Sequence, residues 1–304
     1  MEKLRGHIED ATNEFIDIYK LSSDVTTLAG FLNILDKLKL YKYKKISFDE
    51  PVPKEDDLRL SLALEAKNEI KSFAFWKLKK LRSDFVDKEF LARYPVLFEE
   101  WNKRKTQHEN DESNREIQTN NQYQINYETQ KELLENAITG NREYIECKIN
   151  EWVLSIELPV KFNLQYEYND SGIIKIDLDL PEIDELPKEK AIQLASGQIK
   201  RKEKTQKELK HEYMRCIFGL AVFISSYLFD ISPVIHEIVV SGYTQRRNKR
   251  TGENQDDYIY SVKFHRSGFV GIDFNTIDII SFFEQFENRY ILSQTYELKT
   301  IIPF

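Results

Sequence analysis

Three charged residues with a spacing of two have side chains that could support metal-dependent chemistry. Lys175, Asp177 and Asp179 alternate with apolar residues, so a strand would place them on one face. Carboxylates beside a lysine can hold a metal that activates water against a phosphodiester. Such sites, however, usually place a carboxylate and then the lysine two apart, after an earlier acid. We interpret the three residues as a solvated strand face, and keep a divergent nuclease with Asp177, Asp179 and Glu182 as the alternative.

Positive charge is most concentrated in a polar segment between two expected strands. Residues 245–250 hold four cations, and Tyr243 precedes them. A cationic hairpin tip can enter a nucleic-acid groove or bind phosphates, although an ordinary solvated turn has the same composition. A second basic run is diluted by neighbouring glutamates. The candidate nucleic-acid-binding residues are Tyr243, Arg246, Arg247, Lys249, Arg250, Lys200, Arg201 and Lys202.

Histidine and cysteine do not form a recognisable metal or nucleophile pattern. Of the five histidines, His236 and His265 could meet across a hairpin near Glu237, but facing strand residues are usually only neighbours. Cys147 and Cys216 are too few for a disulfide framework or a four-ligand zinc site. Phosphate-cradling glycine loops, paired-histidine metal helices and serine nucleophile elbows are absent from the sequence. We expect no metal, no cofactor and no catalytic residue.

The first half of the chain has helical periodicity. Apolar residues recur at helical spacing from Glu2 to about Lys45 and again from Glu55 to about Phe85. Residues 102–130 are poor in large aliphatics, so they form a projecting helix, one arm of a helical hairpin, or a partly disordered linker. We favour the helical arm. Gly140 should end a helix and Asn141 should begin the next, which runs to about Ser155.

After Pro159 the periodicity changes from about four to two. Alternating residues predict a hairpin with strands near 160–168 and 174–180, and a second hairpin at 235–243 and 258–264. Between the hairpins, residues 203–229 predict a long helix whose apolar end packs on the sheet. A short helix is expected at 275–290.

These patterns predict an α+β fold. It has a helical N-terminal half with a long polar helical arm, and a C-terminal antiparallel sheet of two hairpins packed on a long helix. The expected domains are a helical domain at 1–100, a polar helical arm or hairpin at 101–157, and an α+β sheet domain at 158–304.

Composition sets limits on location and partners. With 304 residues and 41% hydrophobic content, the chain can fill a core without disulfides. The net charge of −7 argues against indiscriminate binding of polyanions by the whole molecule. The N-terminus lacks the apolar core of a signal peptide, and the longest apolar stretch, at 216–229, is too short to span a bilayer. We expect a cytoplasmic protein without a membrane segment.

Four segments of the second half have recognisable features: IELPVKFNLQYEY, IDLDLPEIDELP, VVSGYTQRRNKRTGE and DYIYSVKF. They contain a leucine-proline strand entry, paired prolines after the second strand and a hairpin loop that ends in Thr251-Gly252. By these features the second half resembles the accessory region of bacterial restriction-endonuclease-like proteins, in which a comparable region often precedes an Mrr-type nuclease domain. The resemblance covers about 141–304 and does not include the nuclease. The resemblance implies a bacterial cytoplasmic protein with a restriction or anti-phage context, and it implies no catalytic residue.

Three functions are compatible with the sequence. The first is a non-catalytic recognition or scaffold protein, which contacts a protein partner or further copies of itself through its helices and a nucleic acid through its basic hairpin loop. The second is the divergent nuclease. The third is a pure oligomerisation protein built on residues 102–130, although that stretch lacks a sustained heptad pattern.

Overall fold

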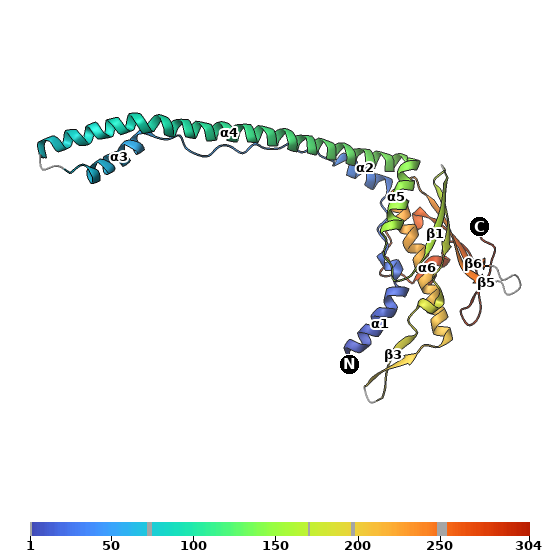
Figure 1. Ribbon diagram of the computed structural model, residues 1–304. Helices are drawn as coiled ribbons and strands as arrows, with labels where there is room; N and C mark the ends of the chain where they lie inside the picture. Colours follow the sequence, from blue (N-terminus) through green and yellow to red (C-terminus); the bar gives the residue numbers. More distant parts are fainter. Residues whose placement is uncertain (1, 72–74, 170, 196–197, 248–253) are drawn as a thin grey trace. The chain divides into compact units, whose positions relative to one another are not determined.

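The chain folds into two compact units. The computed structural model describes residues 2–71, 75–169, 171–195, 198–247 and 254–304 (Figure 1). One unit, here called the sheet unit, contains Met1–Leu38 and Gln130–Phe304. The other, the arm unit, contains Lys39–Thr129. The division differs from the expected domains because a single helix, α4 (Phe75–Thr139), runs through the expected boundary at residue 100. The expected boundary at residue 157 lies inside the sheet unit.

The sheet unit has the α+β fold that the sequence predicts. Six strands pair in the order β1-β2-β5-β6-β7-β8. The first hairpin joins β1 (Asn163–Asn169) to β2 (Ile173–Asp179), and the second joins β5 (Glu237–Arg247) to β6 (Asn254–His265). The hairpins meet through β2 and β5, which run parallel, so the sheet is mixed rather than purely antiparallel. A parallel pair needs a long crossover connection, and α6 lies in it.

Helix α6 (Gln206–Ile231) lies against one face of the sheet. Thr205 begins it with a capping box, because its hydroxyl accepts from the Glu208 amide and the Glu208 side chain accepts from the Thr205 amide. Among the described helices, α6 is the one long and apolar enough to cross a membrane, and 83% of its apolar window is buried in the structure. Core helices of soluble proteins meet the same criteria.

Strand alternation separates the two faces of the sheet. On β2, the side chains of Ile174, Ile176 and Leu178 are fully buried on the α6 side. Lys175 and Asp177 are exposed on the opposite face, which we call the open face. The sequence therefore predicted both faces of this strand correctly.

Further helices complete the sheet unit. They are α1 (Glu2–Ile16), η1 (Ile18–Leu21), α2 (Leu28–Asp36) and α5 (Arg142–Ser155). Gly140 ends α4 with a φ of 71°, and the Asn141 side chain accepts a hydrogen bond from the Tyr144 amide at the start of α5. Both helix boundaries agree with the sequence prediction.

Three parts of the second half differ from the expectation. A separate two-stranded sheet forms from β3 (Glu189–Gln193) and β4 (Ile199–Glu203), with η2 (Ile183–Glu185) before it. The helix expected at 275–290 is wrong in length: α7 covers only Ile279–Glu284, after η3 (Arg266–Gly268). The following β7 (Glu287–Leu292) pairs with the edge of β6, and β8 (Leu298–Lys299) pairs with β7. Pairing with a free sheet edge overrides the helical spacing there.

The arm unit contains α3 (Glu55–Glu69), the first part of α4, and an extended segment at 39–54. The expected helical arm is confirmed, because residues 102–130 lie within α4. Residues 55–85 were expected to form one helix, but α3 ends at Glu69 and α4 begins at Phe75.

The extended segment of the arm unit runs antiparallel to α4. The Tyr43 amide donates to Asn120 at 2.8 Å, and the Glu50 carboxylate binds Arg104 further along. The Trp101 indole donates to the Glu50 carbonyl at 3.1 Å, and the Tyr94 hydroxyl donates to the carbonyl of Pro53 at 3.3 Å. Polar side-chain contacts thus hold this segment on the helix.

Candidate functional site

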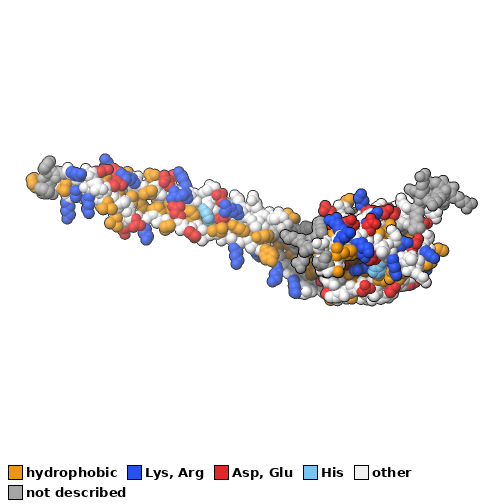
Figure 2. Space-filling model, turned by 90° about the horizontal axis from the view of Figure 1, so that it is seen from below, with side chains coloured by type: hydrophobic (Ala, Val, Ile, Leu, Met, Phe, Trp, Pro, Cys, Tyr) orange, Lys and Arg blue, Asp and Glu red, His pale blue; other side chains and the backbone are white. Residues whose placement is uncertain are grey.

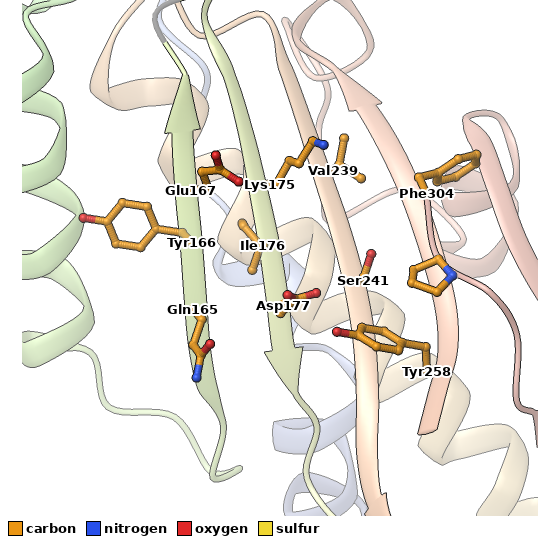
Figure 3. A pocket seen from close by; sticks show the side chains of 11 residues that line it. Gln165, Tyr166, Glu167, Lys175, Ile176, Asp177, Val239, Ser241, Tyr258 and Phe304 are labelled. Atoms are coloured by element: carbon orange, nitrogen blue, oxygen red, sulfur yellow. The ribbon is translucent and has the colours of Figure 1, made fainter. Parts of the chain in front are cut away.

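A polar pocket of about 380 Å³ lies on the open face of the sheet (Figure 3). Strand register builds it, since Gln165 on β1, Asp177 on β2 and Ser241 on β5 stand in one row. Glu167 and Lys175 stand opposite each other in the next row. The pocket therefore offers both signs of charge within a small area.

Asp177 and Tyr258 point toward one another across this pocket (Figure 3). The Tyr258 hydroxyl donates a hydrogen bond to the Asp177 carboxylate. Burial, and then this bond to a negative group, raise the pKa of Tyr258 to about 12. Tyr258 therefore stays protonated at neutral pH and acts as a donor that fixes Asp177, not as a base.

Asp179 lies two residues further along β2, and its neighbours Asp256 and Tyr243 also lie near the Asp177–Tyr258 pair. Burial, and then the nearby charge of Asp256, raise its pKa above the ordinary value. Tyr243 lies opposite Asp179 in the β2–β5 register and is 8% exposed. Within the described ranges, no group of three or more His, Cys, Asp or Glu side chains is arranged to hold a metal ion.

The middle of the open face is covered by the last residues of the chain. The Ser241 and Ser261 hydroxyls are buried and lie 2.8 Å apart. The Phe304 amide donates to the Ser261 hydroxyl at 3.3 Å, and its ring centroid lies 4.1 Å from Lys263 Nζ and 4.0 Å from the Arg289 guanidinium carbon. Two cation–π contacts therefore stabilise this ring over the strands.

The candidate nucleic-acid residues fall into two separate places. Tyr243 is buried in β5, and its ring centroid lies 5.6 Å from that of Tyr258. Arg246 and Arg247 belong to β5 by their backbone, but their side chains lie outside the described residues, as do Lys249 and Arg250 entirely. The remaining candidates, Lys200, Arg201 and Lys202, lie on β4 of the small sheet.

Within β4 the three basic residues do not share one face. Arg201 forms an ion pair with Glu189 at 3.2 Å across the hairpin. Lys200 and Lys202 stand on the other face, opposite Ile192 and Lys190. Both are exposed.

His236, just before β5, and His265, at the end of β6, do not converge. The His265 imidazole Nδ1 lies 3.4 Å from the Glu237 carboxylate, its directly opposite neighbour in the sheet. His236 Nδ1 instead lies 3.4 Å from the Val234 carbonyl.

A second surface, on the arm unit, was not singled out in the sequence. Leu60 is 65% exposed and Leu64 is 59% exposed on α3, whereas Leu62 and Ala66 are buried on its other side. Figure 2 shows hydrophobic side chains exposed along the arm unit. The signal was present, because exposed charges and leucines share heptad-like spacing. We call this surface the outer face of α3, and it consists of Asp56, Asp57, Leu60, Leu64 and Lys67.

Comparison with known proteins finds no significant match to a family model, to a curated protein or to a solved structure.

Proposed function

We propose that this protein is a non-catalytic recognition or scaffold protein that associates with a second copy of itself through the outer face of α3. The observation that carries the proposal is the exposure of Leu60 and Leu64 between acidic residues at one end of this face and Lys67 at the other. Contiguous exposed apolar surface rimmed by polar residues is typical of protein–protein interaction sites.

The outer face of α3 is complementary to itself when two helices run antiparallel. Asp57 and Lys67 are both five residues from position 62, and Leu60 and Leu64 are both two residues from it. A two-fold axis at that level therefore places each Asp57 opposite the other Lys67, and each Leu60 opposite the other Leu64. Asp57 and Lys67 of one helix lie about 15 Å apart along its axis. Both intermolecular Asp57–Lys67 pairs therefore fall within a single helix–helix contact.

The thin core of the arm unit supports association. Among its described residues, the buried apolar side chains are Leu62, Ala66, Phe90 and Trp101. A larger group of large apolar side chains in the same unit is exposed: Leu40, Tyr41, Ile46, Val52, Leu60, Leu64, Trp76, Leu81, Leu91, Val96, Leu97, Phe98, Ile117 and Ile125. A two-layer unit of this kind gains stability by covering apolar surface with a partner.

A charge exchange on α3 tests the proposal. Asp57→Lys or Lys67→Glu alone puts like charges together and should weaken dimerisation by about fivefold to tenfold, as such pairs are worth roughly 1 kcal/mol. The double variant restores opposite charges and should dimerise like the wild type. Light scattering across micromolar concentrations measures the mass, which starts from 36.1 kDa for one chain.

Leu64→Glu tests the apolar part of the outer face of α3, and Leu154→Glu is its matched control. Leu154 is even more exposed, at 88%, but it lies on α5 of the sheet unit. Leu64→Glu should abolish the dimer and Leu154→Glu should leave it intact. A wild-type chain that stays monomeric throughout, or a double variant that fails to recover, would refute self-association through this face.

Nucleic-acid contact is the second candidate function. It is favoured by Lys200 and Lys202, which are exposed on one face of β4, whereas Arg201 is ion-paired on the other. The basic residues at 246–250, which the sequence predicts to form a hairpin loop, would add charge. We expect Lys200→Ala with Lys202→Ala to weaken binding of duplex or single-stranded DNA. The slope of the logarithm of the binding constant against the logarithm of the salt concentration should fall in magnitude by about two, one for each lost phosphate contact. Arg201→Ala should have little effect on either quantity.

A nucleic-acid binding assay decides between presence and absence of this function. Fluorescence anisotropy with labelled DNA and RNA at several salt concentrations gives both affinity and salt slope. If the wild type binds neither polymer at low salt, or if Arg201→Ala weakens binding as much as the lysine pair does, contact through this face of β4 is excluded.

The divergent nuclease is the alternative we favour least, because Asp177 is held by Tyr258. Cleavage of plasmid or RNA in Mg²⁺ or Mn²⁺ that is lost in Asp177→Ala with Asp179→Ala would support it. A bacterial cytoplasmic setting in restriction or anti-phage defence stays a prediction from the sequence resemblance.

A further inference from the structure

Positive charge is concentrated at the end of the arm unit where α3 connects to α4. Residues 70–83 contain five basic residues and no acidic residue, in a chain whose net charge is −7. The basic residues are Lys71, Lys77, Lys79, Lys80 and Arg82. Figure 2 shows basic side chains near hydrophobic ones at this end of the arm. A local positive field of this kind attracts anions even when the whole molecule is acidic.

Arg82 holds the end of α3 on α4. Its Nη2 donates to the carbonyls of Lys67 at 3.3 Å and Ile70 at 3.1 Å, at the end of α3 where carbonyls lack an intrahelical donor. Leu78, one turn before Arg82, is half-buried. This side of α4 therefore faces α3.

Trp76, Lys77 and Lys80 lie on the side of α4 that faces away from α3. With 3.6 residues per turn they span about 100° of the helix surface, roughly opposite to Leu78 and Arg82. They therefore form one outward surface in the first two turns of the helix.

The lysines at the start of α4 have no partner of opposite charge in the chain. Lys77, Lys79 and Lys80, here called the tip lysines, are exposed. Their ammonium groups form no ion pair among the residues that the structure describes, whereas Lys103, further along α4, pairs with Glu99 at 3.0 Å. The tip lysines are therefore free to contact an external anion.

The apolar side chains among the tip lysines favour a lipid bilayer over other anions. Trp76 is 80% exposed and Leu81 is 45% exposed. Tryptophan is enriched at bilayer interfaces, and lysine can lay its aliphatic stem on apolar surface while its ammonium group reaches a phosphate. A nucleic-acid duplex offers phosphates but no apolar layer that could bury Trp76 and Leu81, whereas an anionic bilayer offers both.

We propose that this end of the arm unit binds the surface of an anionic lipid bilayer, with Trp76 at the headgroup level and the tip lysines on lipid phosphates. The contact is peripheral and needs no membrane-spanning segment. It is independent of association through the outer face of α3, because that face contains neither Trp76 nor the tip lysines.

Tryptophan fluorescence of the unmodified protein gives a direct readout. Of the three tryptophans, Trp101 is 7% exposed and Trp152 is 8% exposed, so a change on contact with lipid reports mainly Trp76. Vesicles of phosphatidylglycerol and phosphatidylcholine in equal parts should shift the emission to shorter wavelength and protect it from acrylamide quenching. Vesicles of phosphatidylcholine alone should not. Absence of a shift with the anionic vesicles, or a shift that persists in Trp76→Phe, would overturn the proposal.

Charge variants test the tip lysines. Lys77→Ala with Lys80→Ala should weaken co-sedimentation with the anionic vesicles about tenfold to thirtyfold, because each lysine near an anionic bilayer adds to the binding free energy. The matched control is Lys103→Ala with Lys105→Ala, which removes the same charge from exposed positions on the same helix and should have little effect. Equal weakening by both pairs would contradict a site at this end of the arm.

DNA separates bilayer binding from a general affinity for polyanions. Single-stranded and duplex DNA, at the same phosphate concentration as the vesicles, should leave the emission maximum of Trp76 unchanged. If DNA shifts this emission and the anionic vesicles do not, the surface binds nucleic acid and the proposal is wrong. Light scattering without lipid measures self-association separately, so failure of either proposal is distinguishable from failure of the other.

Discussion

At the scale of single residues, Arg266 connects more parts of the sheet unit than any exposed ion pair does. Its guanidinium donates to the carbonyls of Phe229 at 2.6 Å, Ser232 at 2.9 Å and Ile235 at 3.2 Å, and also to that of Thr26. These carbonyls lie at the end of α6, in the connection to β5 and before α2. Burial lowers the pKa of Arg266, but an arginine remains charged at neutral pH.

Removing this guanidinium should destabilise the protein strongly. Arg266→Met leaves several carbonyls without their donor and should lower the free energy of unfolding by about 2–3 kcal/mol. Arg266→Lys should recover only part of it, because an ammonium cannot reproduce the planar fork. Urea unfolding measures the change. Arg201→Met, which breaks an exposed pair with Glu189, should cost less than about 1 kcal/mol, and an equal cost for both would contradict this account.

Glu208, at the start of α6, contributes to the free energy of unfolding, and this contribution is lost at acid pH. Hydrogen bonds from Lys190, and then from the Thr205 amide and hydroxyl, lower its pKa from 4.5 to about 2. Because the folded pKa lies below the unfolded one, the contribution is complete above about pH 4.5 and is lost as the pH falls toward 2.

Glu208→Gln should therefore flatten the acid side of the stability profile. Melting temperatures from pH 6 down to the acid limit of folding measure this, with the two proteins differing most at the upper end. Glu203→Gln is the control, since the Glu203 side chain is exposed and forms no hydrogen bond or ion pair in the described part of the chain. If the melting temperature of Glu208→Gln still falls steeply as the pH is lowered, other carboxylates cause the effect.

At the scale of elements, one buried carboxylate holds the extended segment of the arm unit on α4. The Glu112 side chain is 3% exposed and accepts hydrogen bonds from the Ile46 amide at 2.9 Å, the Tyr43 hydroxyl at 3.0 Å and Arg115 at 2.8 Å. The Ile46 amide is the largest cause of its lowered pKa, and burial opposes it. The segment has no regular secondary structure, so such contacts must replace a backbone ladder.

Loss of Glu112 should release this segment locally. In Glu112→Ala, hydrogen exchange at the peptide containing Ile46 should become about tenfold faster, while exchange in the sheet unit stays unchanged. Glu116→Ala is the matched control, because its pair with Lys45 is largely exposed. Equal acceleration in both variants would show that the segment depends on the surface pairs instead.

Periodicity predicted the elements whose two sides face different environments. The alternation in β1 and β2, the cap at Asn141 and the length of α6 were all visible in the sequence. Strand β4 was not, because its sequence Ile-Lys-Arg-Lys-Glu has no apolar alternation and depends on pairing with β3. Strand β7 was also missed, since its partner is a distant edge.

The candidate site was predictable only in part. Lys175 and Asp177 were assigned correctly to an exposed strand face. The burial of Tyr243 was not anticipated, because the sheet register shifts between Gly242 and Tyr243 and no local pattern marks such a bulge. Leu60 and Leu64 were overlooked, since Leu58 and Leu62 on the other side of the helix already explained the apolar content.

At the scale of the whole molecule, the two units differ in how they are stabilised. The sheet unit has a continuous core that includes α6, the sheet and α7. The arm unit buries few apolar side chains and exposes many. Variants on the outer face of α3 should therefore change the association of the protein much more than its melting temperature.

Cysteine cross-linking across α3 tests the central claim most directly. In a Cys147→Ser background, which removes the exposed native thiol, chains with Leu60→Cys and chains with Leu64→Cys are mixed and oxidised. Antiparallel pairing predicts a disulfide mainly between the two kinds of chain, with no dimer from a Leu154→Cys control. Cross-links that form only within each kind of chain, or no more readily than in the control, would contradict antiparallel association through this face.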